Sequence, residues 1–341
     1  MSSILLIDST LRDGNHAIRH QLDVQAIAAY TAGAEKAKIP IVIVGHGNGL
    51  GASSLQVGES LLSDEQMIQT ARQNLRNSKL GVYMIPGFAT IPRDLSAAFA
   101  NGVDVVCVGS HCTETDTTKR YINYARTEGK LAYANLMMVH MIPVEKLVEE
   151  CLKSQSYGVN GIILMDSAGA FLPKDVTERI SALVDALDVP IGFHAHNNLG
   201  VAIANSLAAV EAGATIMDCC IQGFGAGAGN AQLEVLVAVL GKLGFSTGID
   251  LYRVLDLADQ AEQNFIKEIP RIKSLSVISG LSGVFSGFAR HVERIAKQFD
   301  VDSRDVFFEL GKRKVVAGQE DLIVEVAMAL TAACKKHAVT S

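Results

Sequence analysis

The chain has 341 residues, a formal net charge of −6 at pH 7 and 49% hydrophobic residues, which is ample for a sizeable buried core. No basic stripe runs along a predicted helix, which argues against a nucleic-acid partner. No apolar run approaches the roughly 20 residues of a membrane span. The N-terminus leads directly into an apolar segment, and the six cysteines show neither CxxC spacing nor a disulfide framework. We therefore expect a cytoplasmic protein with reduced thiols.

Short apolar runs alternate with amphipathic stretches along the first two thirds of the chain. Strand followed by helix, repeated, predicts parallel βα units. Because none of the strands bears the marks of a sheet edge, we expect an α/β protein whose strands close into a (β/α)8 TIM barrel over residues 1–248. The predicted strands are Ile4–Ile7, Ile39–Val44, Leu80–Ile85, Val103–Val108, Leu131–Met137, Gly161–Leu164, Val189–Phe193 and Thr215–Cys219. The predicted helices are Val24–Ala37, Asp64–Asn77, Pro92–Asn101, Asp116–Glu128, Pro143–Tyr157, Pro173–Leu187 and Leu199–Ala212.

The character of the chain changes after the eighth predicted strand. Residues Ala231–Leu243 form the closing helix of the barrel in this interpretation. From about Asp250 onward the pattern is helical without further strand signals. These residues predict a small C-terminal helical domain over 249–341. Its expected helices are Tyr252–Phe265, Ser282–Phe299, Ser303–Leu310 and Glu320–Lys335.

Polar and glycine-rich segments follow several of the predicted strands. Functional residues of (β/α)8 barrels gather at the carboxyl ends of the strands. The pattern therefore predicts one functional site at one end of the barrel. The segments are Asp8–His16, Gly45–Gly49, Asp166–Gly169, His194–Asn198 and Gly223–Asn230.

The strongest local signal is the pair His194 and His196 at the end of the seventh strand. Residues i and i+2 of a strand point to the same side, so both imidazoles could face one metal ion. Asp13, just past the first strand, would come close if the barrel closes strand eight onto strand one. Two histidines and one carboxylate leave coordination positions open for a substrate. Alone, the two histidines could equally be polar loop residues.

Arg12 and His16 flank Asp13 in the sequence. An arginine beside a metal can stabilise negative charge that develops on an oxygen, and a histidine can take or give a proton near pH 7. The alternative is that Arg12 pairs with a carboxylate for structural reasons, which Asp8 could supply, and that His16 is a solvated loop residue. Ser167 and Asn198 could orient ligands or substrate.

The glycine-rich run Gly223–Gly229 is not a dinucleotide-binding fingerprint, because it follows the last strand and lacks an acidic residue about 20 positions further on. A tight loop with amides facing the barrel mouth is the better interpretation. Three more histidines follow strands and are weaker candidates for the site, namely His46, His111 and His140.

The segments Thr10–Gly14 and His194–Asn198 resemble the metal-dependent barrel superfamily that includes isopropylmalate synthase and hydroxymethylglutaryl-CoA lyase. Longer stretches are similar to the family of 4-hydroxy-2-oxovalerate aldolases, and the similarity covers nearly the whole chain. These stretches are Thr10–Gln21, His111–Thr115, Leu136–Met141, Asp166–Ala170, Gly223–Asn230 and Gly318–Val324.

This resemblance implies roles for particular residues. Asp13, His194 and His196 would bind a divalent metal, Mn²⁺ first of all, and Arg12 would stabilise the pyruvate enolate. His16 would remove the proton of the C4 hydroxyl group. The resemblance also implies an acylating aldehyde dehydrogenase as partner, which receives the aldehyde through a channel. We expect an oligomer as well.

Further residues are assigned to the substrate by the resemblance, and some depart from the family. Ser167 would contact the pyruvate moiety. Phe285 stands where the family has tyrosine, which puts stereochemical control in doubt. Asn48 replaces the usual aspartate, and Tyr83 replaces a common leucine and could reshape the aldehyde pocket.

The expected activity is that of a class II aldolase, which cleaves a 4-hydroxy-2-oxo acid to pyruvate and an aldehyde through a pyruvate enolate at the metal. No Schiff-base lysine is required, since none of the strand ends carries one. Two alternatives remain open. One is an acyl-CoA synthase or lyase of the same superfamily, and the other is a partner-binding subunit with weak catalysis.

Overall fold

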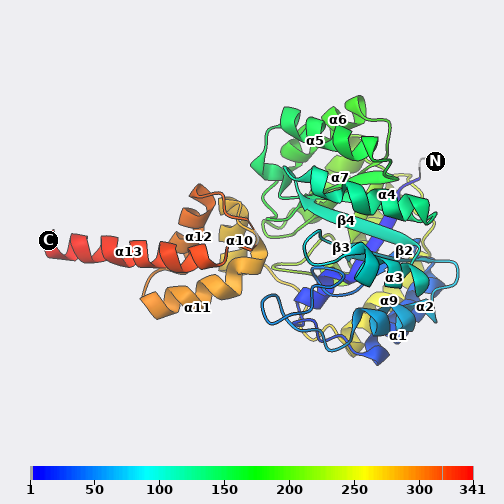
Figure 1. Cartoon of the computed structure of the whole chain (residues 1–341), viewed down its shortest axis with the longest axis horizontal. Coiled ribbons are helices and arrows are strands. Elements are labelled where there is room, and N and C mark those ends of the chain that lie inside the picture. The colour runs from blue at the N-terminus through cyan, green and yellow to red at the C-terminus, as the bar shows by residue number, and fades with distance from the viewer. Residues whose placement is uncertain (1–2, 317, 341) are drawn as a thin grey trace.

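The computed structural model describes residues 3–316 and 318–340. Its eight strands form one closed parallel barrel in sequence order, which confirms the predicted (β/α)8 architecture (Figure 1). The closing pair is β1 with β8, where Ile7 lies opposite Asp218. The strands are β1 (Leu5–Leu11), β2 (Ile41–Val44), β3 (Lys79–Met84), β4 (Val105–His111), β5 (Leu131–Met137), β6 (Gly161–Asp166), β7 (Ile191–Ala195) and β8 (Ile216–Cys219).

Helices surround the barrel, and most of them match the predicted stretches. The predicted helix Pro92–Asn101 begins as a π-helical turn, η2 (Ile91–Leu95), and the helix predicted at Asp116 begins as a 3₁₀ turn, η3 (Thr115–Thr118). Asp23 and Ser63 cap α1 and α2 by accepting backbone N–H groups. The barrel helices are α1 (Val24–Ala37), α2 (Asp64–Arg72), α3 (Ser96–Ala100), α4 (Lys119–Thr127), α5 (Val144–Ser156), α6 (Pro173–Ala186), α7 (Ala202–Glu211) and α8 (Leu233–Lys242).

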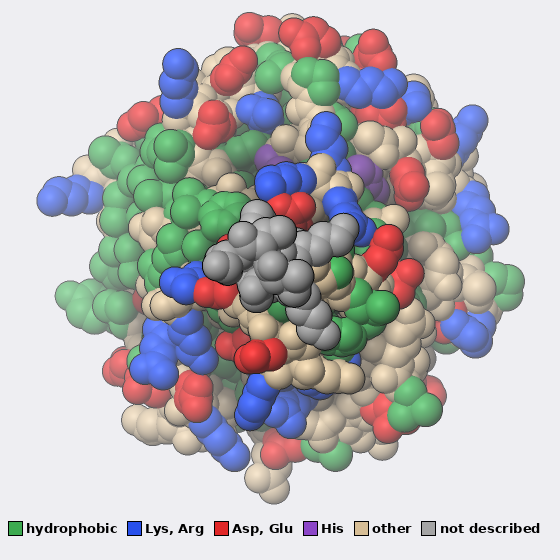
Figure 2. Space-filling model, turned by 90° about the vertical axis from the view of Figure 1, so that its left-hand side faces the viewer, with side chains coloured by type: hydrophobic (Ala, Val, Ile, Leu, Met, Phe, Trp, Pro, Cys, Tyr) green, Lys and Arg blue, Asp and Glu red, His purple; other side chains and the backbone are tan. Residues whose placement is uncertain are grey.

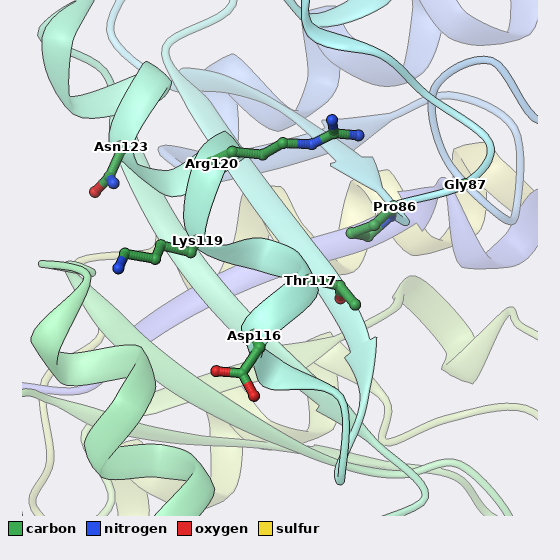
Figure 3. A pocket seen from close by; sticks show the side chains of 7 residues that line it. All are labelled: Pro86, Gly87, Asp116, Thr117, Lys119, Arg120 and Asn123. Carbon is green, nitrogen blue, oxygen red and sulfur yellow. The ribbon is translucent and has the colours of Figure 1, made fainter.

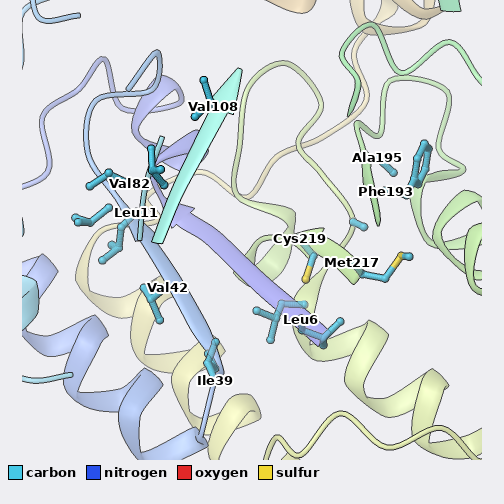
Figure 4. Packing of buried hydrophobic residues seen from close by; sticks show 14 of the residues in the cluster. Leu6, Leu11, Ile39, Val42, Val82, Val108, Phe193, Ala195, Met217 and Cys219 are labelled. Atoms are coloured by element: carbon cyan, nitrogen blue, oxygen red, sulfur yellow. The ribbon is translucent and has the colours of Figure 1, made fainter. Parts of the chain in front are cut away.

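Alternating strand residues build two apolar layers. Leu6, Val42 and Met217 point outward and pack beneath the helices (Figure 4). Residues of the opposite parity, such as Ile7 and Ile163, fill the barrel interior. Because parallel strands are covered on both faces, the strands are apolar almost throughout. A polar side chain that points inward is therefore an exception that calls for an explanation.

Two predicted boundaries were wrong in ways that affect the site. The first strand continues to Leu11, so the Asp8–Leu11 segment lies in the barrel and not in a loop. The predicted helix Ser282–Phe299 begins too early, because Ser282 is the last residue of α10 (Ser274–Ser282), a helix that was not predicted. Gly283 takes a left-handed conformation with φ of 66°, which ends α10. The turn η6 (Ser286–Phe288) then leads into α11 (Ala289–Phe299).

The C-terminal helices divide between the barrel core and a second core. Helix α9 (Leu251–Asn264) packs on the barrel and contributes Val254 and Leu257 to the barrel's apolar cluster. Helices α10 and α11, with α12 (Ser303–Lys312) and α13 (Asp321–Thr340), share a separate cluster. They stand beside the barrel, and α13 projects away from it (Figure 1). This cluster is centred on Phe288, Val306, Phe307 and Ile323.

Polar contacts join the C-terminal helices to the barrel mouth. The Nε2 atom of His140 lies 2.9 Å from the carbonyl oxygen of Gly283. The Nδ2 atom of Asn198 donates to the Ser286 hydroxyl oxygen at 2.5 Å. The turn between α10 and α11 is therefore anchored over the strand ends.

Five of the cysteines, at positions 107, 112, 151, 219 and 220, are buried and free, while the side chain of Cys334 lies outside the described residues. Within residues 3–316 and 318–340, no helix combines the length and the apolar character that crossing a membrane requires.

Candidate metal centre and active site

Three predicted metal ligands meet at the barrel mouth. His194 lies in β7, His196 follows its end, and Asp13 begins the 3₁₀ turn η1 (Asp13–His16) after β1. Their ligand atoms all lie within 4.8 Å of one another, and all three residues are buried. The closure of β8 onto β1 is what brings the ends of β7 and β1 together. Barrel topology thus unites residues that are about 180 positions apart in the sequence.

The chemistry of these side chains fits a divalent cation. In the described chain, Nε2 of His194 and Nδ1 of His196 are buried without a hydrogen-bond partner, so both nitrogens are free to ligate. Burial lowers the pKa of His196 to about 4, so its imidazole is neutral as a ligand must be. Burial opposes ionisation of Asp13, but Arg12 and the two histidines hold its pKa well below the usual range. The centre therefore offers a carboxylate and two imidazoles.

The glycine-rich loop after β8 wraps around Asp13. The Oδ2 atom of Asp13 accepts from Nδ2 of Asn230 at 2.6 Å and from the backbone N–H of Ala226 at 3.2 Å. A Cβ atom on Gly225 would stand 2.5 Å from that same oxygen, so the loop needs glycine there. The expectation that backbone amides face the mouth is met at Ala226. Asn230 was not predicted as a site residue, although its place at the end of the run pointed to this edge.

Asp218 is a second carboxylate at the centre that sequence reasoning missed. It lies opposite His194 in the β7–β8 pairing, and its Oδ1 atom is 3.3 Å from Nδ1 of His194. Burial lowers the pKa of His194, but Asp218 more than offsets this and raises the pKa above its usual value. A buried acidic residue in the apolar strand β8 was the available signal. A carboxylate this close to Nδ1 favours Nε2 as the nitrogen that would bind a metal.

Arg12 pairs with Asp13 and not with Asp8. Its Nη1 atom donates to Oδ1 of Asp13 at 2.8 Å, and its guanidinium lies 4.5 Å from the ring centre of Tyr83. The alternative partner was wrong, because Asp8 accepts from the hydroxyls of Thr10 and Tyr30 instead. Nε and Nη2 of Arg12 are buried and lack a partner among the described residues. Two charged donors are thus available beside the metal centre.

His16 lies against the loop after β2. A Cβ atom on Gly47 would come within 2.5 Å of the His16 ring, so the ring is packed and not free in solvent. Its ring centre is 5.1 Å from that of His20, which in turn stacks on His46 at 3.6 Å. Burial lowers the pKa of His16, with Asp13 partly opposing. His16 is therefore poised to accept a proton.

The predicted substrate residues border this centre to different degrees. Ser167 follows β6 beside His196, and its hydroxyl accepts from the backbone N–H of Met138 at 3.1 Å. Tyr83 points into the barrel beneath Arg12. The ring of Phe285 lies against Gly287 of its own turn, whose neighbour Ser286 bonds to the barrel.

The three weaker candidate histidines lie outside the group of metal ligands, and each has a hydrogen-bond partner of its own. His46 is fixed by the backbone, since Nδ1 accepts from Asn48 at 3.0 Å and Nε2 lies 3.0 Å from the carbonyl oxygen of Gly58. His111 bonds to Thr113, and His140 bonds to the C-terminal domain. An open hollow outside the barrel mouth contains none of the predicted site residues (Figure 3). Pro86, Asp116 and Arg120 are among the residues that line it.

A closed (β/α)8 barrel with two histidines and a carboxylate at its mouth defines a metal-dependent enzyme. The HMGL-like family matches residues 3–260, and the DmpG-like communication domain matches residues 270–332. The chain thus belongs to the HMGL-like family, in its branch of 4-hydroxy-2-oxovalerate aldolases. A protein of that name from Spirochaeta aurantia is 60% identical over 95% of each chain. Another, from Pectobacterium atrosepticum, is 58% identical over 95% of this chain and 94% of its own.

A solved structure supports the fold alone. The carboxyl transferase domain of Rhizobium etli pyruvate carboxylase superposes with a TM-score of 0.80 at 18% identity. The match covers 97% of this chain and 60% of that one. The barrel and the adjoining helices are therefore an arrangement that recurs at low sequence identity.

Proposed function

We propose that this chain is a class II aldolase that cleaves 4-hydroxy-2-oxovalerate, or a close 4-hydroxy-2-oxo acid, to pyruvate and an aldehyde. The observation that carries the proposal is the juxtaposition of Asp13, His194 and His196 with the unpartnered donors of Arg12. The similarity to aldolases of that name extends over nearly the whole chain. The reaction type and the substrate class follow from these two findings together.

Asp13, His194 and His196 would hold the divalent metal, for which we propose Mn²⁺. When bound, such an ion supplies Lewis-acid polarisation of the 2-oxo group. Arg12 carries the second part of the charge stabilisation. Its Nη1 is engaged by Asp13, so its planar fork is held in place while Nε and Nη2 remain to donate to the oxyanion of the enolate.

His16 is the base in this proposal. Its lowered pKa keeps the imidazole neutral at physiological pH, so it can accept the proton of the C4 hydroxyl. Loss of that proton lets the C3–C4 bonding electrons pass to C3 as the aldehyde departs. Gly47 leaves room for the ring beside the mouth, where a larger residue would displace it.

Ser167 would contact the carboxylate end of the pyruvate half, since it stands beside His196 and its hydroxyl would turn to the substrate from the carbonyl oxygen of Met165, to which it donates at 3.4 Å. Tyr83 would border the aldehyde half from beneath Arg12. Phe285 would reach the C4 substituent from the turn above the mouth. Phenylalanine offers no hydrogen bond there, so we expect weak discrimination between the two C4 configurations.

The C-terminal domain would bind an acylating aldehyde dehydrogenase, which is our proposal for the partner. Its support is the match to the communication domain and an apolar surface on this end of the molecule. Figure 2 looks onto that end and shows apolar side chains gathered on one side. Exposed large apolar residues occur in α10, α12 and α13, namely Val277, Leu281, Phe308, Val324 and Met328. Such a surface is typical of an interaction site.

The test is pyruvate release from racemic 4-hydroxy-2-oxovalerate with added Mn²⁺, and again after chelation. We expect release that chelation abolishes and that Mn²⁺ restores, together with consumption of more than half of the racemate. Release that requires CoA thioesters would favour the acyl-CoA alternative. A protein that binds metal but releases no pyruvate from any 4-hydroxy-2-oxo acid would contradict the proposal.

A further inference from the structure

Asn135 is an unexplained polar residue in the barrel interior. It lies in β5 with its side chain on the inward side, and it is completely buried. Among the residues that the structure describes, neither Nδ2 nor Oδ1 of Asn135 has a hydrogen-bond partner. Burying an amide without a partner is costly, so an amide in such a place normally serves a ligand or an ordered water. None of the roles assigned above uses this residue.

The hydroxyl group of Tyr83 lies in front of Asn135. A Cβ atom on Gly109 would collide with this hydroxyl, so the Tyr83 ring reaches from β3 across β4. Gly109 is the residue paired with Asn135 between β4 and β5. The same hydroxyl lies 3.7 Å from the sulfur of Met165 in β6. Since β5 runs between β4 and β6 and Asn135 pairs with Ile163, two residues before Met165, a hydroxyl between Gly109 and Met165 lies near Asn135.

The Tyr83 hydroxyl is also poorly satisfied. A thioether sulfur is a weak acceptor, so the bond to Met165 leaves most of the hydroxyl's capacity unused. The side chains of Tyr83 and Asn135 together offer an amide NH2, an amide oxygen and a hydroxyl group within an apolar wall. Ile163 and Cys107 belong to that wall and cannot satisfy them.

Tyr83 connects this polar pair to the reaction centre. The face of its ring lies 4.5 Å from the guanidinium of Arg12, while its hydroxyl points toward the β4–β6 side. The metal ligands come from β7 and the end of β1, so the pair faces them from the other side of the barrel. The carboxylate and keto groups of the pyruvate half would be bound by the metal centre and Arg12. The part of a bound substrate left to face Asn135 is then the aldehyde half.

We infer that Asn135 and the Tyr83 hydroxyl form a subsite for a further hydroxyl group on the aldehyde half of the substrate. This inference rests on the proposed aldolase function. The favoured substrates are then 4-hydroxy-2-oxo acids that release a hydroxyaldehyde, in preference to those that release an apolar aldehyde of the same size. Asn135 and Tyr83 act on specificity here and take no part in bond cleavage.

The test runs the reaction in the aldol direction, with pyruvate, Mn²⁺ and one of two matched aldehydes. Glycolaldehyde and propanal have the same number of non-hydrogen atoms, so they differ by a hydroxyl in place of a methyl group. The readout is the ratio of kcat/KM for glycolaldehyde to kcat/KM for propanal, corrected for the free aldehyde in solution. Comparing this ratio between variants cancels the different intrinsic reactivities of the two aldehydes.

Asn135→Leu keeps the size of the side chain and removes both polar atoms, and Tyr83→Phe removes the hydroxyl alone. We expect Asn135→Leu to lower the ratio about tenfold or more, because one well-formed neutral hydrogen bond is worth roughly that factor. Tyr83→Phe should lower it in the same direction. Asn123→Leu, at an exposed position of α4, is the matched control and should leave the ratio unchanged.

A ratio unchanged within twofold in folded Asn135→Leu and in Tyr83→Phe would overturn the inference, because Asn135 would then hold only water. If Asn135→Leu does not fold, the ratio measured for Tyr83→Phe alone decides whether the inference stands. Addition of pyruvate to acetaldehyde by the unaltered chain is measured beside them. Failure of that reaction would contradict the aldolase proposal itself, which separates the two outcomes.

Discussion

Oδ1 of Asp218 lies 3.3 Å from Nδ1 of His194, whose ring also belongs to the group of possible metal ligands with Asp13 and His196. A carboxylate behind a ligating histidine fixes the ring's tautomer and orientation and raises its basicity. Both residues lie in strands that pair directly, so the geometry is built into the barrel. The metal affinity of this protein should therefore depend on a residue that does not touch the metal.

Asp218→Asn tests that dependence. We expect the variant to bind Mn²⁺ about 10- to 100-fold more weakly, because the amide cannot supply the carboxylate's charge. Its pyruvate production should recover at high Mn²⁺ concentration. Asp8→Asn is the control, since Asp8 is an equally buried carboxylate whose partners are Thr10 and Tyr30. Equal metal affinity in Asp218→Asn and the unaltered chain would contradict this account.

Arg12→Lys tests the role of the guanidinium. A lysine could still pair with Asp13, but it lacks the fork that directs a second nitrogen at the substrate. We expect kcat to fall by about 100-fold or more, with a smaller change in KM. The measurement is steady-state pyruvate release at saturating Mn²⁺. Near-normal turnover in Arg12→Lys would show that the oxyanion is stabilised in another way.

The pH dependence of cleavage should report His16. Burial lowers the pKa of His16 from its usual value, so the imidazole is neutral and able to act as a base at physiological pH. The value of kcat/KM should then fall only when the pH drops through this lowered pKa. His16→Asn should lose about 100-fold or more of the activity and lack this acidic limb. An identical limb in His16→Asn would assign the titration to another group.

The stability of the protein should also depend on pH through His20, before α1, and His46, after β2. Burial lowers the pKa of His20 to about 3 and that of His46 to about 4. The unfolded chain takes up these protons near pH 6.5 while the folded chain does not. The free energy of unfolding should therefore fall as the pH drops from 7 toward 4. Denaturant unfolding of His20→Phe should show a smaller fall over this range, and an equal fall would count against the assignment.

Some residues of the site could be predicted from the sequence, and others could not. His194 and His196 could be predicted as a pair because they are two residues apart at the end of a strand. The number of strands implies that β8 closes onto β1, which brings Asp13 close to both histidines. Asp218 and Asn135 could not be predicted as site residues from the sequence, because their roles depend on which side chains lie close to them inside the barrel. Helix α10 and the turn after it were also missed, because the predicted helix began at Ser282, where α10 ends, and a single left-handed residue, Gly283, makes that turn.

The most direct test of the central claim is a titration of the metal-free protein with Mn²⁺, with binding and pyruvate release from 4-hydroxy-2-oxovalerate measured on the same samples. The account predicts one tightly bound ion per chain and activity that rises in proportion to it. In His196→Ala, both should be lost while the fold is kept. Full activity without metal, or unchanged binding and turnover in His196→Ala, would contradict the assignment of Asp13, His194 and His196 as the catalytic metal site.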